Sequence, residues 1–141
     1  MAPASSSSEV RSPTILVVDD SATMRMSIEM SLRLAGYQVV IAEHGGAALE
    51  LLKGGLRPDL VLTDIVMPGV DGLGLIREAR KILRFTPIIA LTTQGQRLLR
   101  NEGKAAGATA WLIKPTGGHA LISLVQRFLG ETARVTSPGP A

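Results

Sequence analysis

Short runs of apolar residues alternate along the chain with stretches whose apolar residues recur every three or four positions. The runs are the segments 14–18, 37–42, 59–63, 87–91 and 109–113. They are rich in β-branched residues and lack polar alternation, which is typical of strands buried on both faces of a parallel sheet. Between the runs, spacings such as that of Met26, Met30 and Leu34 predict amphipathic helices. Five strands alternating with five helices in right-handed βαβ units indicate a three-layer α/β sandwich.

The two ends of the chain lack this pattern. Residues 1–13 and 130–141 are rich in Ser, Pro, Ala and Gly, and such segments cannot bury enough apolar surface to offset the entropy lost on ordering. We expect both to be disordered tails on one domain over 14–129. We also expect no attached output domain, since few residues follow position 130.

Composition narrows the classes of protein that this chain can represent. It has 141 residues, no cysteine and no uninterrupted apolar run longer than four residues. These features exclude disulfides, thiolate zinc sites and a cysteine nucleophile, and they exclude a membrane-spanning helix. The net charge is +3, but only four residues are aromatic, too few for the stacking platforms of single-strand binders. We therefore expect a soluble, cytoplasmic protein without nucleic-acid or membrane partners.

Polar side chains follow four of the five expected strands. Asp19 and Asp20 follow the first strand, Asp64 the third, Thr92 the fourth and Lys114 the fifth. The carboxyl ends of parallel strands meet at one edge of the sheet, where ligands bind. Crowded carboxylates must share protons or hold a cation, and a small set of oxygen ligands favours Mg²⁺. The hydroxyl of Thr92 and the ammonium of Lys114 suit the outer oxygens of a phosphoryl group.

These residues alone leave the chemistry open. A carboxylate can act as a nucleophile and form an acyl phosphate, but the pattern does not choose between Asp20 and Asp64 for that role. Each polar residue taken singly also suits a helix cap or a solvated loop end. Chance placement at four strand ends together is a poor explanation.

The chain resembles the response-regulator receiver domains of bacterial two-component signalling, and among them the stand-alone chemotaxis-type (CheY-like) regulators. The segments that carry the resemblance are ILVVDDSATMR (15–25), LVLTDIVMPGVDG (60–72), PIIALTT (87–93) and GATAWLIKP (107–115). The similarity covers residues 14 to about 129. It implies a flavodoxin-like, doubly wound (βα)5 sandwich whose parallel sheet has the strand order 2-1-3-4-5.

The resemblance assigns roles at the acidic end of the sheet. It implies that Asp64 is the phosphoacceptor. It also implies that Asp19, Asp20 and Asp64 hold Mg²⁺ together with the backbone carbonyl of Val66. Both assignments are residue by residue and rest on the matching motifs.

The resemblance also implies a switch. Lys114 pairs with the phosphoryl oxygens, Thr92 moves to hydrogen-bond them, and the aromatic residue Trp111 follows inward. This changes the surface formed by the fourth helix, the fifth strand and the fifth helix. The phosphorylated form favours the closed arrangement, so the mechanism is a population shift.

The implied partners are a sensor histidine kinase as phosphodonor, a protein output target and a phosphatase, with the chain itself a monomer and not an enzyme with an external substrate. Chemotaxis or motility is the expected pathway, and a phosphorelay shuttle or phosphate sink is the alternative. An Mg²⁺-dependent aspartyl-phosphate phosphohydrolase is disfavoured, because Val66 stands where that chemistry needs a second acid. A nucleotide-binding domain is disfavoured because no glycine-rich loop follows the first strand.

Basic residues recur at helical spacing in two places. The first stripe is Arg77, Arg80, Lys81 and Arg84, and the second is Arg97, Arg100 and Lys104. The simpler interpretation is two solvated faces, and the alternative is that the second stripe contacts an acidic partner. His44 is expected to be an exposed loop histidine without a role.

Overall fold

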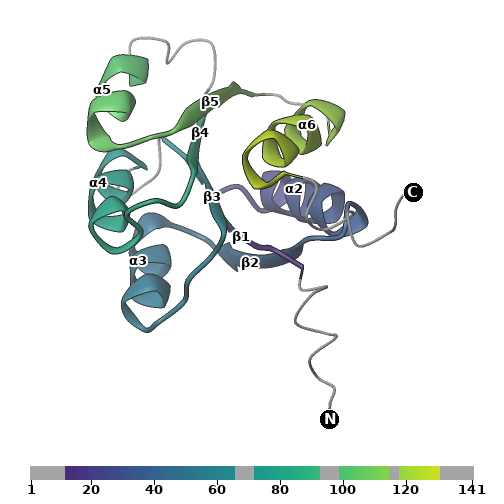
Figure 1. The fold of residues 1–141 in the computed structure, drawn as a ribbon, viewed down its shortest axis with the longest axis horizontal. Helices are drawn as coiled ribbons and strands as arrows, with labels where there is room; N and C mark the ends of the chain where they lie inside the picture. Colours follow the sequence, from purple (N-terminus) through teal and green to yellow (C-terminus); the bar gives the residue numbers. More distant parts are fainter. Residues whose placement is uncertain (1–11, 66–71, 93–98, 115–117, 131–141) are drawn as a thin grey trace.

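A computed structural model describes residues 12–65, 72–92, 99–114 and 118–130 (Figure 1). The strands are β1 (Thr14–Val18), β2 (Gln38–Ala42), β3 (Leu60–Asp64), β4 (Ile88–Thr92) and β5 (Ala110–Ile113). The helices are α2 (Ala22–Leu34), α3 (Gly45–Lys53), α4 (Gly72–Ile82), α5 (Leu99–Ala106) and α6 (Gly118–Leu129). Strands and helices alternate as the apolar pattern predicts.

The five strands form one parallel sheet in the order β2-β1-β3-β4-β5. This confirms the predicted strand order and the flavodoxin-like fold. Helices α2 and α6 cover one face of the sheet, and α3, α4 and α5 cover the other (Figure 1). The order reverses between β1 and β3, so the carboxyl ends of these two strands flank the crevice in which such folds bind ligands.

The three central strands, β1, β3 and β4, are buried on both faces, which explains their apolar sequences. In β1, Ile15 and Val17 pack in the cluster that includes α2 and α6, whereas Leu16 and Val18 pack in the cluster under α3 and α4. All four side chains have no exposed surface. Successive residues of a strand point to opposite faces, so each apolar run supplies both cores at once.

The predicted strand boundaries are correct to within one residue. β3 and β4 extend to Asp64 and Thr92, so these two side chains belong to the ends of their strands rather than to the loops that follow. The terminal segments 1–11 and 131–141 lie outside the described residues. The disordered tails and the domain limits therefore stay predictions.

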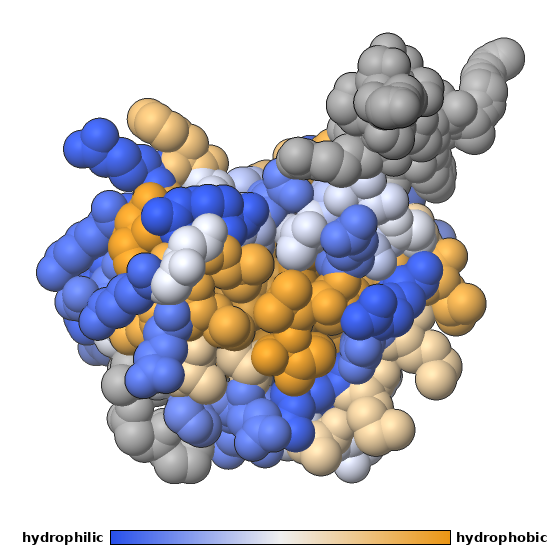
Figure 2. All heavy atoms as spheres, turned by 90° about the horizontal axis from the view of Figure 1, so that it is seen from below, coloured by the Kyte–Doolittle hydropathy of each residue, from blue (hydrophilic) through white to orange (hydrophobic). Residues whose placement is uncertain are grey.

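Apolar side chains also reach the surface. A central apolar area bordered by charged side chains appears on the face seen from below (Figure 2). The α2 side chains Met26, Met30 and Leu34 are 65%, 63% and 84% exposed, and Phe85, after α4, is 94% exposed. No helix in the described ranges is long and apolar enough to cross a membrane.

Candidate functional site

Asp19 lies immediately after β1 and has no exposed surface. Its Oδ1 accepts a hydrogen bond of 2.9 Å from the backbone N–H of Ser21. Its Oδ2 is buried and accepts no hydrogen bond from the described residues, although the Lys114 ammonium lies 3.0 Å away as an ion pair. A buried carboxylate oxygen without a hydrogen bond is costly unless a cation compensates it.

Asp64 ends β3, beside Asp19 across the crevice. Its Oδ1 accepts a hydrogen bond of 2.8 Å from the N–H of Ile65, and its Oδ2 lies 3.2 Å from Nζ of Lys114. Lys114 therefore bridges the two buried carboxylates. The strand ends bring together side chains 45 and 50 positions apart in the sequence, as the sequence predicts.

Burial and the neighbouring charges shift the pKa values of Asp64 and Lys114. Burial raises the pKa of the Asp64 carboxyl, the Lys114 ammonium lowers it and the Asp19 carboxylate raises it, with a net pKa above the usual range of aspartate. Burial disfavours the charge on Lys114, but attraction by Asp19 and Asp64 outweighs it and raises the pKa of Lys114. Two carboxylates thus share one ammonium, and the site has an uncompensated negative charge.

The acidic cluster fits Mg²⁺. Asp19, Asp20 and Asp64 each offer a carboxylate oxygen, and these oxygens lie within 4.8 Å of one another. Asp20 is exposed, so it can reach a cation from the solvent side, whereas Asp19 is buried. Hard oxygen ligands in this number suit an ion that keeps several waters. Val66, the predicted fourth ligand through its carbonyl, lies outside the described residues.

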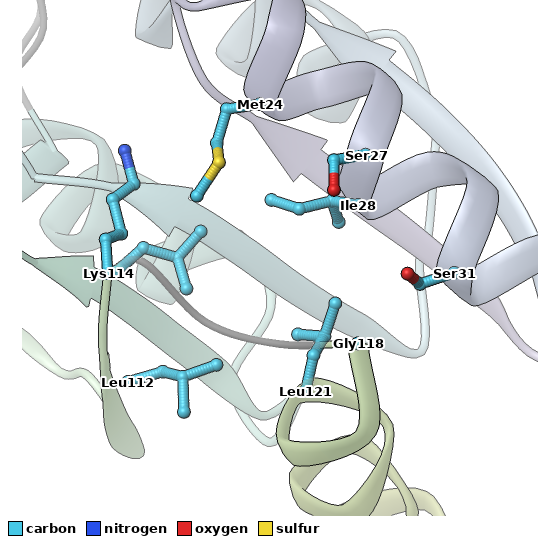
Figure 3. A pocket seen from close by; sticks show the side chains of 9 residues that line it. Met24, Ser27, Ile28, Ser31, Leu112, Lys114, Gly118 and Leu121 are labelled. Atoms are coloured by element: carbon cyan, nitrogen blue, oxygen red, sulfur yellow. The ribbon is translucent and has the colours of Figure 1, made fainter.

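The remaining predicted site residues surround this cluster. Thr92 is buried at the end of β4, and its carbonyl accepts a hydrogen bond from the N–H of Lys114. Trp111 in β5 is half-buried and packs against the core under α3 and α4. Figure 3 shows the Lys114 side chain lining a small pocket between α2 and α6, with Leu112 and Met24 nearby. An apolar stem and a charged head at the carboxylates are the usual arrangement of a partly buried lysine.

Two supporting residues are missing from the sequence prediction. Ser21 is the N-cap of α2, and its Oγ accepts a bond of 3.3 Å from the N–H of Met24. Arg25, in the first turn of α2, donates 2.7 Å to the carbonyl oxygen of Asp19. Both fix the backbone that carries Asp19. The N-cap role of Ser21 was predictable from the sequence, because the serine directly precedes a segment of helical apolar periodicity.

The expectation for His44 is wrong. The residue is exposed, as predicted, but its Nδ1 accepts a hydrogen bond of 3.1 Å from the N–H of Ala47 and caps α3. A side-chain acceptor at this position satisfies one of the free N–H groups of the first helical turn.

Acidification is expected to release Mg²⁺ at a higher pH than ordinary aspartates would. The raised pKa of Asp64 means that this carboxyl takes up a proton earlier as the pH falls, and the protonated form cannot balance a divalent charge. Isothermal titration calorimetry with Mg²⁺ at successively lower pH values measures the effect. In the Asp64→Asn variant the affinity should be weaker and should change less over the same upper part of the pH series. A wild-type affinity that stays constant until ordinary aspartates titrate would contradict this prediction.

Comparison with known proteins identifies relatives over nearly the whole described region. The response regulator receiver domain matches residues 15–126. The response regulator MprA of Mycobacterium sp. (strain KMS) is 37% identical over 124 residues, which are 88% of this chain and 54% of that protein. The chain thus spans about half the length of the relatives of this kind that it matches.

Solved structures agree with this result. The chemotaxis protein CheY4 of Vibrio cholerae superposes with a TM-score of 0.79 at 36% identity, covering 84% of this chain and 99% of that one. The receiver domain of the sensor histidine kinase PA1611 from Pseudomonas aeruginosa PAO1 superposes with a TM-score of 0.78 at 33% identity, covering 85% and 99%. That structure has a magnesium ion coordinated in its active site cleft.

Proposed function

The chain belongs to the response-regulator receiver family, and from this premise we propose that it is a switch in which Asp64 accepts a phosphoryl group. Receiver domains take phosphate from histidine kinases and signal to output partners. The observation that carries the proposal is the Lys114 ammonium between two buried carboxylates, 3.0 Å from Asp19 Oδ2 and 3.2 Å from Asp64 Oδ2. In this proposal the Asp64 carboxylate is the nucleophile, Lys114 is the fixed cation, and the acidic cluster of the same crevice is the cation site.

The residues divide the work of phosphoryl transfer between them. A carboxylate oxygen of Asp64 attacks the phosphorus of the donor, the bond to the donor's leaving group breaks, and an acyl phosphate forms on Asp64. Lys114 then exchanges its contact with the Asp64 carboxylate for contact with the new phosphoryl oxygens. Thr92 supplies a hydroxyl at the neighbouring strand end. Charge stabilisation by groups already in position is the main catalytic contribution in such transfers.

Mg²⁺ completes the proposed site. Asp19, Asp20 and Asp64 would hold it, with the carbonyl of Val66 as the fourth protein ligand. When bound, the ion neutralises negative charge on the phosphoryl oxygens. The three carboxylate oxygens within 4.8 Å of one another and the magnesium ion in the related PA1611 receiver domain support this assignment.

We place the output on the surface formed by α5, β5 and α6. Lys114 directly follows β5 and is bound through its N–H to the Thr92 carbonyl, so a movement of Thr92 on phosphorylation reaches the end of β5. Trp111 and the 38% exposed Ile113 lie on that strand. Chemotaxis is the pathway that the similarity to Vibrio cholerae CheY4 supports, with contact to a partner protein as the output.

The phosphodonor is proposed to dock on the exposed apolar stripe of α2, which is Met26, Met30 and Leu34. The helix begins two residues after Asp20, so a protein lying along it reaches the crevice that contains Asp64. Exposed apolar side chains in a row are typical of protein contacts.

A charge in this stripe is expected to separate two kinds of phosphodonor. Met30→Glu should slow phosphotransfer from phosphorylated histidine-kinase cores by about tenfold, because a loss of about 1.4 kcal/mol of interaction free energy corresponds to a tenfold change. Uptake from a small acyl phosphate should stay unchanged, because a small donor needs no docking surface. Radiolabelled transfer assays with a panel of kinase cores measure both rates.

Ser123→Glu is the matched control, since it adds the same charge at an exposed position of α6. It should leave both rates as in the wild type. Equal kinase rates in Met30→Glu and the wild type would contradict docking on α2. Absence of transfer to the wild type from every kinase core would contradict the proposed kinase partner.

A further inference from the structure

The end of α4 carries an unusual concentration of positive charge. Residues 77–85 contain four basic side chains and one acidic side chain, an excess equal to the net charge of the whole chain, +3. Three of the basic residues are exposed: Arg77 and Lys81, which are four positions apart and so share a face of α4, and Arg84, which lies just after the helix ends at Ile82.

Arg80 departs from the predicted solvated stripe. Its Nη1 donates to the carbonyl oxygens of Leu83, Thr86 and Arg84 at 2.9, 2.7 and 3.3 Å. Its Nη2 donates 2.7 Å to the carbonyl of Gly107, beyond the end of α5. One guanidinium therefore ties the segment that follows α4 to Gly107, the residue that follows α5.

Phe85 stands in the middle of this bonded segment. Its side chain is 94% exposed, while the carbonyls of Leu83, Arg84 and Thr86 around it are all held by Arg80. The backbone thus presents an aromatic ring to water from a fixed position. A pre-organised side chain loses less entropy on binding a partner than a mobile one, and aromatic residues and arginine are enriched in binding hot spots.

The neighbouring helix adds to the same corner. Helices α4 and α5 lie side by side (Figure 1). The N–H of Gly107, whose carbonyl Arg80 holds, donates 3.1 Å to the carbonyl of Lys104. Lys104, in the last turn of α5, is exposed. It lies three residues before Gly107, whose carbonyl accepts the hydrogen bond from Arg80.

We propose that this basic corner, formed by Arg77, Lys81, Arg84 and Phe85, is a docking surface for an acidic segment of another protein. Carboxylates of that segment would face the three cations, which lie on the last turns of α4 and just after it, and one of its apolar side chains would cover Phe85. The surface lies at the C-terminal end of α4. Gly72, at the N-terminal end of the helix, packs against Asp64 and Ile65. The partner is therefore distinct from the phosphodonor proposed for α2.

The charge pattern favours a protein partner over nucleic acid or a membrane. Glu78 lies within the corner and pairs with Lys81 at 3.1 Å, which interrupts the positive field that a phosphate backbone would require. Lipid-binding basic clusters use about 4–8 lysines or arginines, whereas at this corner Glu78 already pairs with one of the few exposed cations. An acidic protein segment can place its own polar side chains opposite Glu78.

A random peptide library displayed on phage and selected on the immobilised full chain tests the proposal. We expect enriched peptides to be acidic, to contain an apolar side chain and to bind more weakly as salt is added. Their affinity should fall about tenfold in the double variant Arg77→Glu/Arg84→Glu and severalfold in Phe85→Ala, as for the loss of interface hot spots. The double variant Lys53→Glu/Arg127→Glu carries the same change of charge at exposed positions of α3 and α6 and should bind like the wild type.

If all variants unfold at the same urea concentration as the wild type, a loss of peptide binding comes from the changed surface and not from unfolding. Enriched peptides that bind both double variants equally would overturn the proposal. Recovery of no acidic peptide would overturn it too. So would binding of duplex DNA or phosphatidylserine vesicles that Arg77→Glu/Arg84→Glu abolishes while no selected peptide depends on these residues.

Discussion

Gly72→Ala is expected to destabilise the protein by at least about 3 kcal/mol, the upper part of the range for overpacking a buried position. Gly72 opens α4 and is buried, and its N–H donates 2.7 Å to the carbonyl of Ile65. A Cβ at this position would overlap the backbone of Asp64 and Ile65. Neither backbone can yield as the end of a flexible side chain could, so the start of α4 must shift and carry Asp64 with it. Urea unfolding followed by circular dichroism measures the loss.

Gly46→Ala is the matched control. Gly46 also lies in the first turn of a helix, but the nearest atom to an added Cβ is His44 Nδ1 at 3.4 Å, which is ordinary contact. Alanine is favoured over glycine in helices by about 1 kcal/mol, so this variant should be at least as stable as the wild type. If Gly72→Ala unfolds at the same urea concentration as the wild type, the close packing of α4 on the end of β3 is wrong.

The fold could be predicted to a large extent because its signals are local. The apolar runs place each strand to within one residue, since each run is continuous along the chain and is bounded by polar or turn-forming residues. The strand order is not a local property. It depends on which strands pair across the sheet, and only the resemblance to receiver domains predicts it.

The candidate site could be predicted as a set of residues, because the ends of parallel strands meet at one edge. What could not be predicted is how those residues contact one another. Lys114 lies between Asp19 and Asp64, and a sequence does not show which carboxylate a lysine reaches. The roles of Arg80 and His44 were missed for a related reason. Helical spacing assigns a side chain to a face, but backbone groups elsewhere accept or donate the hydrogen bonds, as the Gly107 carbonyl does for Arg80.

Asp64→Asn is expected to abolish phosphorylation while leaving the fold intact. The variant removes the attacking carboxylate but keeps the shape of the side chain. Burial and the nearby Asp19 raise the pKa of Asp64, so the ionised carboxylate is disfavoured in the folded protein and a neutral amide should not destabilise it. Urea unfolding should therefore give a midpoint no lower than that of the wild type.

Glu43→Gln is the control for a lost carboxylate at the same edge of the sheet. Glu43 directly follows β2 and is exposed, and it has no role in the proposed phosphoryl transfer. This variant should take up phosphate like the wild type.

Intact-protein mass spectrometry after incubation with Mg²⁺ and a small acyl phosphate tests directly whether Asp64 accepts the phosphoryl group. We expect the wild type and Glu43→Gln to gain the mass of one phosphoryl group and Asp64→Asn to gain none. No gain in the wild type, or an equal gain in Asp64→Asn, would contradict the assignment of Asp64 as the phosphoacceptor.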